Sequence, residues 1–351
     1  MRTSARLALL GLVALVSCLL SAAGIYDRAE ELSRARLEAG RMKNVVILEG
    51  ASARLPAPES VPTAEPVSAA AAELPEPEAP EILSSVMDSS PGADIRETTI
   101  PGGLQLRNAT GYPVDPEQML ADGPSVRLPA EGPQILIIHT HGSEAYTPAG
   151  LDRYEANDVS RTEDLRCNVI RVGDELARLL EDQGLNVLHD REIYDYPSYT
   201  GSYARSGEAV ERYLAAYPDL AVVIDLHRDA LGADGVVYKT MAEEEGTVAS
   251  QIMLLVGSDD SGLEHPNWRS NLSLALYLQN AVSRAHPTLM RPVALVKERY
   301  NQHLTGGSLI LEVGSSGNTL QEALAAVRLF ADAAGPALRE LASAPETVSE
   351  P

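Results

Sequence analysis

The segment His139-Thr140-His141-Gly142-Ser143-Glu144 holds residues of the types that ligate metals. His141 and Glu144 form an H-x-x-E pair, which at a strand-to-turn transition can direct an imidazole nitrogen and a carboxylate to one cation. We expect Gly142 to supply backbone freedom for that turn. Side chains alternate along a strand, so His139 is expected on the same face as His141. His139 could then be a ligand, a neighbour of a ligand or a substrate contact. Taken alone, H-x-x-E is a short and common pattern.

A second cluster, Asp225-Leu226-His227-Arg228-Asp229, ends the apolar run that starts at Leu220. A single histidine at this position could be an ordinary core residue. Charged residues rarely finish a buried strand without partners, however, and Arg228 and Asp229 follow directly. We expect Asp225 or Asp229 to orient the His227 ring through its second nitrogen, as acidic neighbours of metal-bound histidines do.

A third feature is Glu312, near the end of the apolar run Ser308 to Val313. Burial raises the pKa of a carboxyl group and a nearby cation lowers it, which together suit a general base that later acts as an acid. The alternative is an edge strand with Glu312 facing water. Ile310 shares its face and argues against that alternative.

Two histidines, one glutamate and a separate carboxylate are the composition of a catalytic zinc site. We therefore predict zinc ligated by His141, Glu144 and His227, and metal-assisted hydrolysis. Glu312 is expected to take a proton from the attacking water and to pass it to the leaving amine. Arg228 or His303 is expected to stabilise the developing oxyanion.

The elements that must position these residues alternate between strands and helices from about Gln134 onward. We expect strands at 134–139, 185–188, 220–226, 236–240, 252–256, 292–296 and 308–313, and helices at 168–183, 202–216, 271–285 and 319–334. Such alternation predicts an α/β domain with a mainly parallel sheet under helices. In such sheets functional residues lie just beyond the carboxyl ends of the strands.

The N-terminal region 1–30 is predicted to be a membrane anchor, because the apolar run 7–25 is long enough to span a bilayer and follows Arg2 and Arg6. A cleaved signal peptide and a lipoprotein signal at Cys18 are the alternatives. All three place the remainder outside the cytoplasm, and the first gives a single-pass protein of the cell membrane.

Residues 31–100 are predicted to be a helix-permissive stalk and a disordered Pro/Ala/Glu-rich linker, since the stretch 56–81 has too few apolar side chains to fold. The catalytic domain is expected at 101–335 and a disordered tail at 336–351. A net charge of -22 argues against nucleic-acid binding, which needs excess Lys and Arg. The two cysteines, Cys18 and Cys167, exclude a cysteine-type zinc site.

The chain resembles the stage II sporulation protein P family of cell-wall hydrolases. The matching stretches are collinear: HTHGSEAYTP (139–148), NVIRVGDEL (168–176), HDREIYDYPSYTGSYARS (189–206), VIDLHRDA (223–230), NLSLALYLQ (271–279) and YNQHLTGGSLILEVGSSGNTL (300–320). The N-terminal apolar run and tether are also similar to that family's layout.

This resemblance implies a three-layer amidase-like fold and zinc-dependent N-acetylmuramoyl-L-alanine amidase activity on peptidoglycan, with endopeptidase activity on its cross-links. It further implies a role in septal wall thinning and engulfment during sporulation. The implied partners are a lytic transglycosylase and a polytopic membrane scaffold. A catalytically inactive wall-binding module and a zinc carboxypeptidase acting on stem peptides are the alternatives.

The resemblance leaves two ligand assignments open. Related amidases often place the zinc glutamate farther from the first histidine, at the start of a helix, where this chain has Glu163. We prefer Glu144, because H-x-x-E forms half a zinc site locally. The family pattern also allows His139 in place of His141. The tyrosines at 194, 196, 199 and 203 are expected either to contact substrate or to cover the sheet edge. We expect His189, His265 and His286 to be structural or surface residues.

Overall fold

A computed structural model describes residues 94–98, 103–147, 160–233 and 236–342. The predicted anchor at 1–30, nearly all of the predicted stalk and linker at 31–100, and residues 343–351 lie outside this part of the chain. Among the described residues no helix is both long and apolar enough to cross a bilayer. The predicted span at 7–25 is not among them.

The centre of the domain is a seven-stranded sheet with the strand order β2-β10-β9-β11-β5-β3-β4. Its strands are β2 Leu106–Asn108, β3 Ile135–Ile138, β4 Val187–His189, β5 Val222–Asp229, β9 Ile252–Val256, β10 Val293–Leu295 and β11 Ser308–Ser315. Neighbouring strands are parallel except at β9–β11, which is antiparallel. The predicted parallel sheet is therefore two parallel blocks that run in opposite directions. The strands β3, β5 and β11 belong to one block, so their carboxyl ends meet at one edge.

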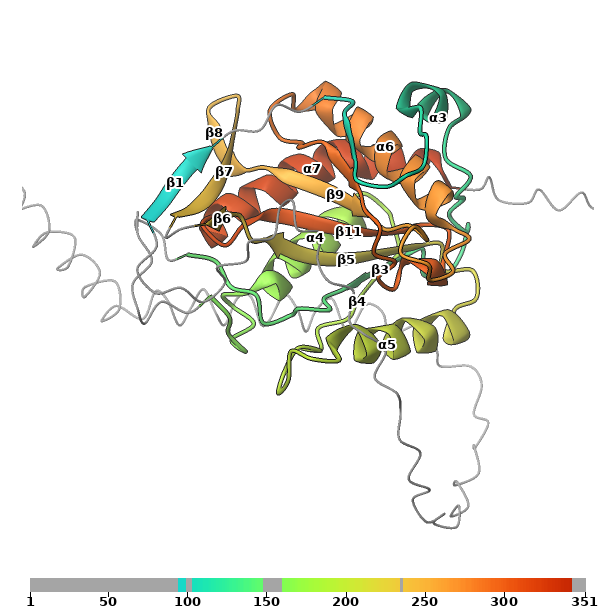
Figure 1. Cartoon of the computed structure of the whole chain (residues 1–351), viewed down its shortest axis with the longest axis horizontal. Coiled ribbons are helices and arrows are strands. Elements are labelled where there is room, and N and C mark those ends of the chain that lie inside the picture. The colour runs from blue at the N-terminus through green and yellow to red at the C-terminus, as the bar shows by residue number, and fades with distance from the viewer. Residues whose placement is uncertain (1–93, 99–102, 148–159, 234–235, 343–351) are drawn as a thin grey trace, which may run out of the picture. The chain divides into compact units, whose positions relative to one another are not determined.

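Helices cover both faces of this sheet (Figure 1). The helices α4 Val169–Asp182, α6 Trp268–Ala285 and α7 Leu320–Glu340 pack on one face, and α5 Ser202–Ala216 packs on the other. A short helix, α3 Pro116–Asp122, lies against α6. The alternation along β3 explains the layers: Ile135 and Ile137 join the core under α4, while Leu136 and Ile138 join the core under α5.

A smaller sheet combines β1 Asp94–Thr98, β6 Gly232–Ala233, β7 Val236–Glu244 and β8 Thr247–Ser250. β1 pairs in parallel with the first half of β7, and β8 pairs with the second half as a hairpin. β1 falls at 94–98, inside the range where we expected only stalk and linker. Its pairing with β7 shows that the folded part begins before residue 101.

The last helix is longer than predicted. α7 begins with a capping box formed by Thr319 and Glu322, as the sequence suggests at this point. It continues past Gly335 and Pro336 to Glu340, where we expected a tail from residue 336. The reason is burial, since Leu338 and Leu341 extend the apolar stripe and are almost completely buried in the core. That packing outweighs the hydrogen bond lost at Pro336.

Candidate metal centre

The turn after β3 brings the H-x-x-E pair together. The backbone N–H of Glu144 donates to the carbonyl of His141 at 3.1 Å, and His141 Nδ1 lies 3.6 Å from Glu144 Oε1. Gly142 is needed here for space and not for a positive φ angle. A Cβ at Gly142 would lie 3.3 Å from the backbone of both Glu192 and Ile193. The structure thus places His141 beside Glu144, and Gly142 permits the turn through its small size.

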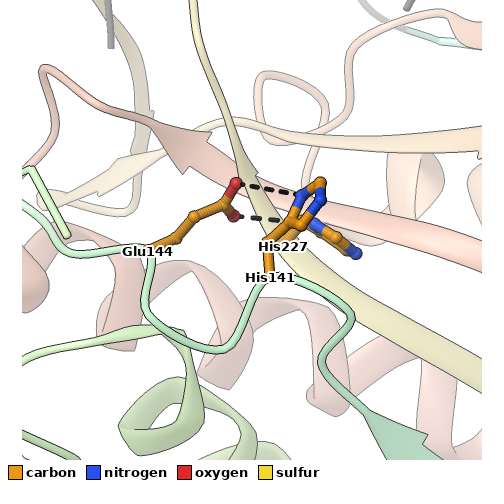
Figure 2. A group of neighbouring side chains, drawn as sticks. All are labelled: His141, Glu144 and His227. Atoms are coloured by element: carbon orange, nitrogen blue, oxygen red, sulfur yellow. Dashed lines mark ion pairs between the residues drawn. The ribbon is translucent and has the colours of Figure 1, made fainter. Parts of the chain in front are cut away.

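His227 completes a group of three, although it is far from the other two in the sequence. Its Nδ1 lies 3.6 Å from Glu144 Oε2, and its ring centroid lies 5.0 Å from that of His141. Figure 2 shows the Glu144 carboxylate facing both imidazoles, one oxygen toward each. One ligand atom from each residue lies within 4.8 Å of the other two.

The three residues lie close enough to share one ion. Ligand atoms about 2.0–2.1 Å from zinc are separated by roughly 3.3 Å in a tetrahedron. The two 3.6 Å spacings, each to a different oxygen of Glu144, are slightly longer than this. All three residues are buried. The donor set and the burial are those of a metal ligand group.

The group already contains a buried negative charge on Glu144. Burial acts to raise the pKa of Glu144, but hydrogen bonding to His141 and His227 outweighs it and holds that pKa well below the usual value. Glu144 Oε2 also accepts the backbone N–H of Arg228 at 3.0 Å. Burial acts to lower the pKa of His227, but Asp225 and Glu144 raise it well above the usual value. Glu144 is therefore an ionised carboxylate at neutral pH.

Glu312 stands beside this group on the neighbouring strand. In the β5–β11 ladder its Cα is paired with that of His227. Its Oε2 is buried and has no hydrogen-bond partner. Burial, followed by repulsion from Asp229, raises the pKa of Glu312 to about 8. A β-bulge follows immediately, between Glu312 and Ser315, with Gly314 at φ 70°. Glu312 is thus a carboxyl group poised to exchange a proton near neutral pH.

Of the two acidic neighbours proposed for the His227 ring, the structure selects Asp225. Asp225 Oδ1 lies 2.8 Å from His227 Nε2, the nitrogen turned away from Glu144. Thr140 holds the carboxylate by its backbone N–H at 2.8 Å and its hydroxyl at 2.6 Å. Asp229 instead binds the buried Arg291 at 2.7 Å.

His139 is not on the face of His141, contrary to our expectation. β3 ends at Ile138 and the chain turns there, so the alternation of a strand no longer applies. His139 is completely buried between Leu226, whose carbonyl lies 2.9 Å from Nδ1, and His189, whose Nε2 lies 2.8 Å from Nε2. Burial lowers the pKa of His139 to about 3, so the ring is neutral. It is outside the group of three.

The remaining candidate positions, Arg228, His303 and Glu163, lie as follows. Arg228 is buried, and its guanidinium donates to the carbonyls of Ala145 and Ser160 at 2.8 and 2.9 Å. It therefore fixes the backbone around Glu144 and is not directed at the site as an oxyanion donor. His303 lies in the 3₁₀ helix 302–304, before β11 begins. Its ring centroid is 6.4 Å from that of His265. Glu163 is exposed, while Glu144 lies between the histidines.

The sequence reasoning missed the residues that brace the Glu144 turn. Asp195 accepts the backbone N–H and the hydroxyl of Ser143 and pairs with Arg161 at 2.7 Å. Arg161 also lies 3.5 Å from Glu144 Oε1. No local spacing links these positions, because they come from separate loops. In the stretch DYPSY (195–199), only the tyrosines suggested a role at the site, and nothing in the sequence pointed to Asp195.

Two of the four tyrosines lie at the site. Tyr199 stacks on His141 with ring centroids 4.6 Å apart and is half exposed, and Tyr203 meets the same ring edge-on at 5.4 Å. Tyr194 is buried and its hydroxyl donates to Asp190 at 2.7 Å, so this tyrosine has a structural role and does not contact substrate. Tyr196 is exposed.

A sequence model described as "Stage II sporulation protein P (SpoIIP)" matches residues 76–335, well over half of the 351 residues. The chain belongs to this family. The stage II sporulation protein P of Bacillus subtilis (strain 168) is 28% identical over 209 residues. That match covers 56% of this chain and 49% of the relative, so the chain spans about half the length of this stage II sporulation protein P.

Solved structures similar to this SpoIIP chain include two N-acetylmuramoyl-L-alanine amidases. AmiC2 of Nostoc punctiforme is 15% identical, with 60% of this chain and 98% of that chain covered and a TM-score of 0.35. The catalytic domain of CwlV from Bacillus (Paenibacillus) polymyxa var. colistinus is 13% identical, with 59% of this chain and 97% of that chain covered and a TM-score of 0.36.

Proposed function

We propose that this SpoIIP chain is a zinc-dependent peptidoglycan hydrolase that cleaves the N-acetylmuramoyl-L-alanine amide and can also cleave stem-peptide cross-links. The observation that carries the proposal is the buried group of His141, Glu144 and His227 with Glu312 beside it, whose buried Oε2 has no hydrogen-bond partner. Membership of the family supports a role in sporulation.

His141, Glu144 and His227 would hold the zinc ion. A zinc ion bound there polarises a carbonyl group and makes water a nucleophile near neutral pH. Asp225 orients His227 through its second ring nitrogen, and Thr140 holds Asp225 in place.

Glu312 accepts the proton from the attacking water and returns it to the leaving amine. Its pKa of about 8 shows how strongly its surroundings oppose an isolated negative charge, and a cation beside it lowers that value toward the operating pH. Tyr199, half exposed against His141, would form part of the surface that contacts the substrate.

We further propose that the domain acts outside the cytoplasm, joined to the cell membrane by a helix at 7–25 and a tether. Its partners would be a lytic transglycosylase and a polytopic membrane scaffold of the engulfment machinery. The support for this arrangement is the N-terminal sequence together with the family.

The test is incubation of the purified protein with peptidoglycan and zinc, followed by mass analysis of the released products. Free stem peptides beginning with L-alanine are expected, together with glycan strands that have lost their peptides. Binding without release would favour a wall-binding module. Shortened stem peptides still joined to muramic acid would favour a carboxypeptidase, and either result contradicts the amidase assignment.

A further inference from the structure

The two histidines of the proposed metal site lie just beyond the point where their strands separate. The β3–β5 ladder ends with the pair Ile138 and Asp225. His141 follows three residues later on one side and His227 two residues later on the other. Backbone pairing between these two strands has stopped before either imidazole, so another interaction must set the spacing of the rings.

Side chains continue the connection on both faces of the sheet. On the side of α5, Asp225 accepts two hydrogen bonds from Thr140, one of them from its backbone N–H. On the side of α4, His139 reaches the carbonyl of Leu226 at 2.9 Å. His139 is two residues before His141, and Leu226 is one residue before His227. One imidazole therefore bridges the two chain segments that carry the histidines.

The direction of this hydrogen bond follows from simple chemistry. A carbonyl oxygen only accepts, so Nδ1 of His139 must carry the proton. The contact between Nε2 of His139 and Nε2 of His189 at 2.8 Å needs one donor, and since Nδ1 of His139 already donates to Leu226, we assign this proton to His189. Asp174 Oδ1 lies 3.2 Å from the other nitrogen of His189 and 3.0 Å from Nε of Arg191. The chain of contacts fixes the tautomer and the orientation of His139.

The packing of α4 is adapted to this arrangement. A Cβ at Gly173 would lie 2.6 Å from Nε2 of both His139 and His189. Only a glycine allows the helix to approach the two rings at this distance.

We propose that His139 is a positioning residue for the metal site, acting through its Nδ1–H bond to the Leu226 carbonyl, with its Nε2 held against His189. This inference rests on the proposed function, because it assumes that His141 and His227 bind zinc together. The role is distinct from ligation, since both nitrogens of His139 are already engaged away from the group of three.

The test compares two substitutions that keep different halves of the imidazole. In His139→Asn the side-chain amide can replace Nδ1–H and donate to Leu226. In His139→Gln the longer side chain places its amide toward His189 and leaves the Leu226 carbonyl without its donor. Both variants leave space in the core, so both are expected to lower the melting temperature.

The measurements are zinc affinity by competition with a chelating dye, and the visible spectrum of the cobalt(II)-loaded protein, on the full chain in detergent. We expect His139→Gln to weaken zinc binding about 10-fold or more and to change the cobalt spectrum. His139→Asn should stay within about threefold of wild type, with the same spectrum. His265→Asn, at another buried histidine, is the matched control and should change neither.

Equal zinc affinity and equal spectra for wild type, His139→Asn and His139→Gln would overturn the positioning role while leaving the proposed function intact. Complete loss of zinc in both variants, as in His141→Ala, would make His139 a ligand and would also overturn it. If wild type itself binds no zinc, the proposed function fails first, and this inference fails with it.

Discussion

Glu312 lies in an environment very different from that of an exposed glutamate. A carboxyl group with buried, unpaired Oε2 and a pKa of about 8 is neutral in the folded metal-free protein at pH 5 and charged well above pH 8. The unfolded chain ionises it near 4.5. The folded state therefore binds the extra proton between these values, and the contribution of Glu312 to stability falls as the pH rises from about 4.5 to 8.

Glu312→Gln removes this dependence. In the presence of a chelator we expect the variant to melt at about the same temperature as wild type at pH 5, and to melt several degrees higher at pH 9. With zinc, the variant should retain the metal and lose nearly all hydrolysis. Thermal melts across this pH range and product release measure the two effects.

The control for this prediction is Glu163→Gln, which makes the same chemical change at an exposed position. It should leave melting and hydrolysis close to wild type at every pH. A Glu312→Gln protein with wild-type hydrolysis would contradict the role of general base.

At the scale of elements, we expect the bulge in β11 to position Glu312, which directly precedes it. Gly314 adopts φ 70°, and a Cβ there would lie 2.8 Å from Cβ of Ser250. We expect Gly314→Ala to cost about 1–2 kcal/mol for the left-handed backbone and more for the clash, and to lower hydrolysis by displacing Glu312. Chemical denaturation and product release measure these changes.

Gly184→Ala is the matched comparison, because Gly184 also has a positive φ, 87°, and no atom lies within 4 Å of its added Cβ. It should show the backbone cost alone and leave hydrolysis unchanged. Equal destabilisation in the two variants, with equal activity, would show that the bulge does not position Glu312.

At the scale of the whole molecule, zinc connects two parts of the chain that are far apart in sequence, the turn after β3 and the end of β5. A ligand that binds only the folded state stabilises it by about 2.7 kcal/mol at 100 times its dissociation constant. We therefore expect zinc to raise the melting temperature by several degrees, and the chelated protein to lose this increase. A zinc titration followed by thermal melts tests this.

His227→Ala should abolish the zinc-dependent increase, because it removes one of three buried ligands. The comparison variant is His286→Ala, a histidine after the end of α6 that pairs with Asp332 on the surface of α7. It should keep the full increase. Loss of the increase in both variants, or in neither, would contradict the proposed ligand group.

The sequence by itself determined the kinds of residue available and the strand ends that carry them. The motif H-x-x-E, the histidine after LAVVIDL and the glutamate in SLILEVG were sufficient to predict the group and the carboxyl beside it, because parallel strands bring their carboxyl ends to one edge. The alternation of apolar segments also predicted an α/β domain with a mainly parallel sheet, though not the antiparallel junction between β9 and β11.

Only the tertiary structure decided the direction in which each side chain points. His139 lost its predicted face because β3 ends at Ile138, and Arg228 is directed into backbone carbonyls that come from another loop. Asp195 and Arg161 reach Glu144 from segments with no spacing in common. Local patterns encode periodicity within one element, whereas these contacts depend on where separate elements are packed against each other.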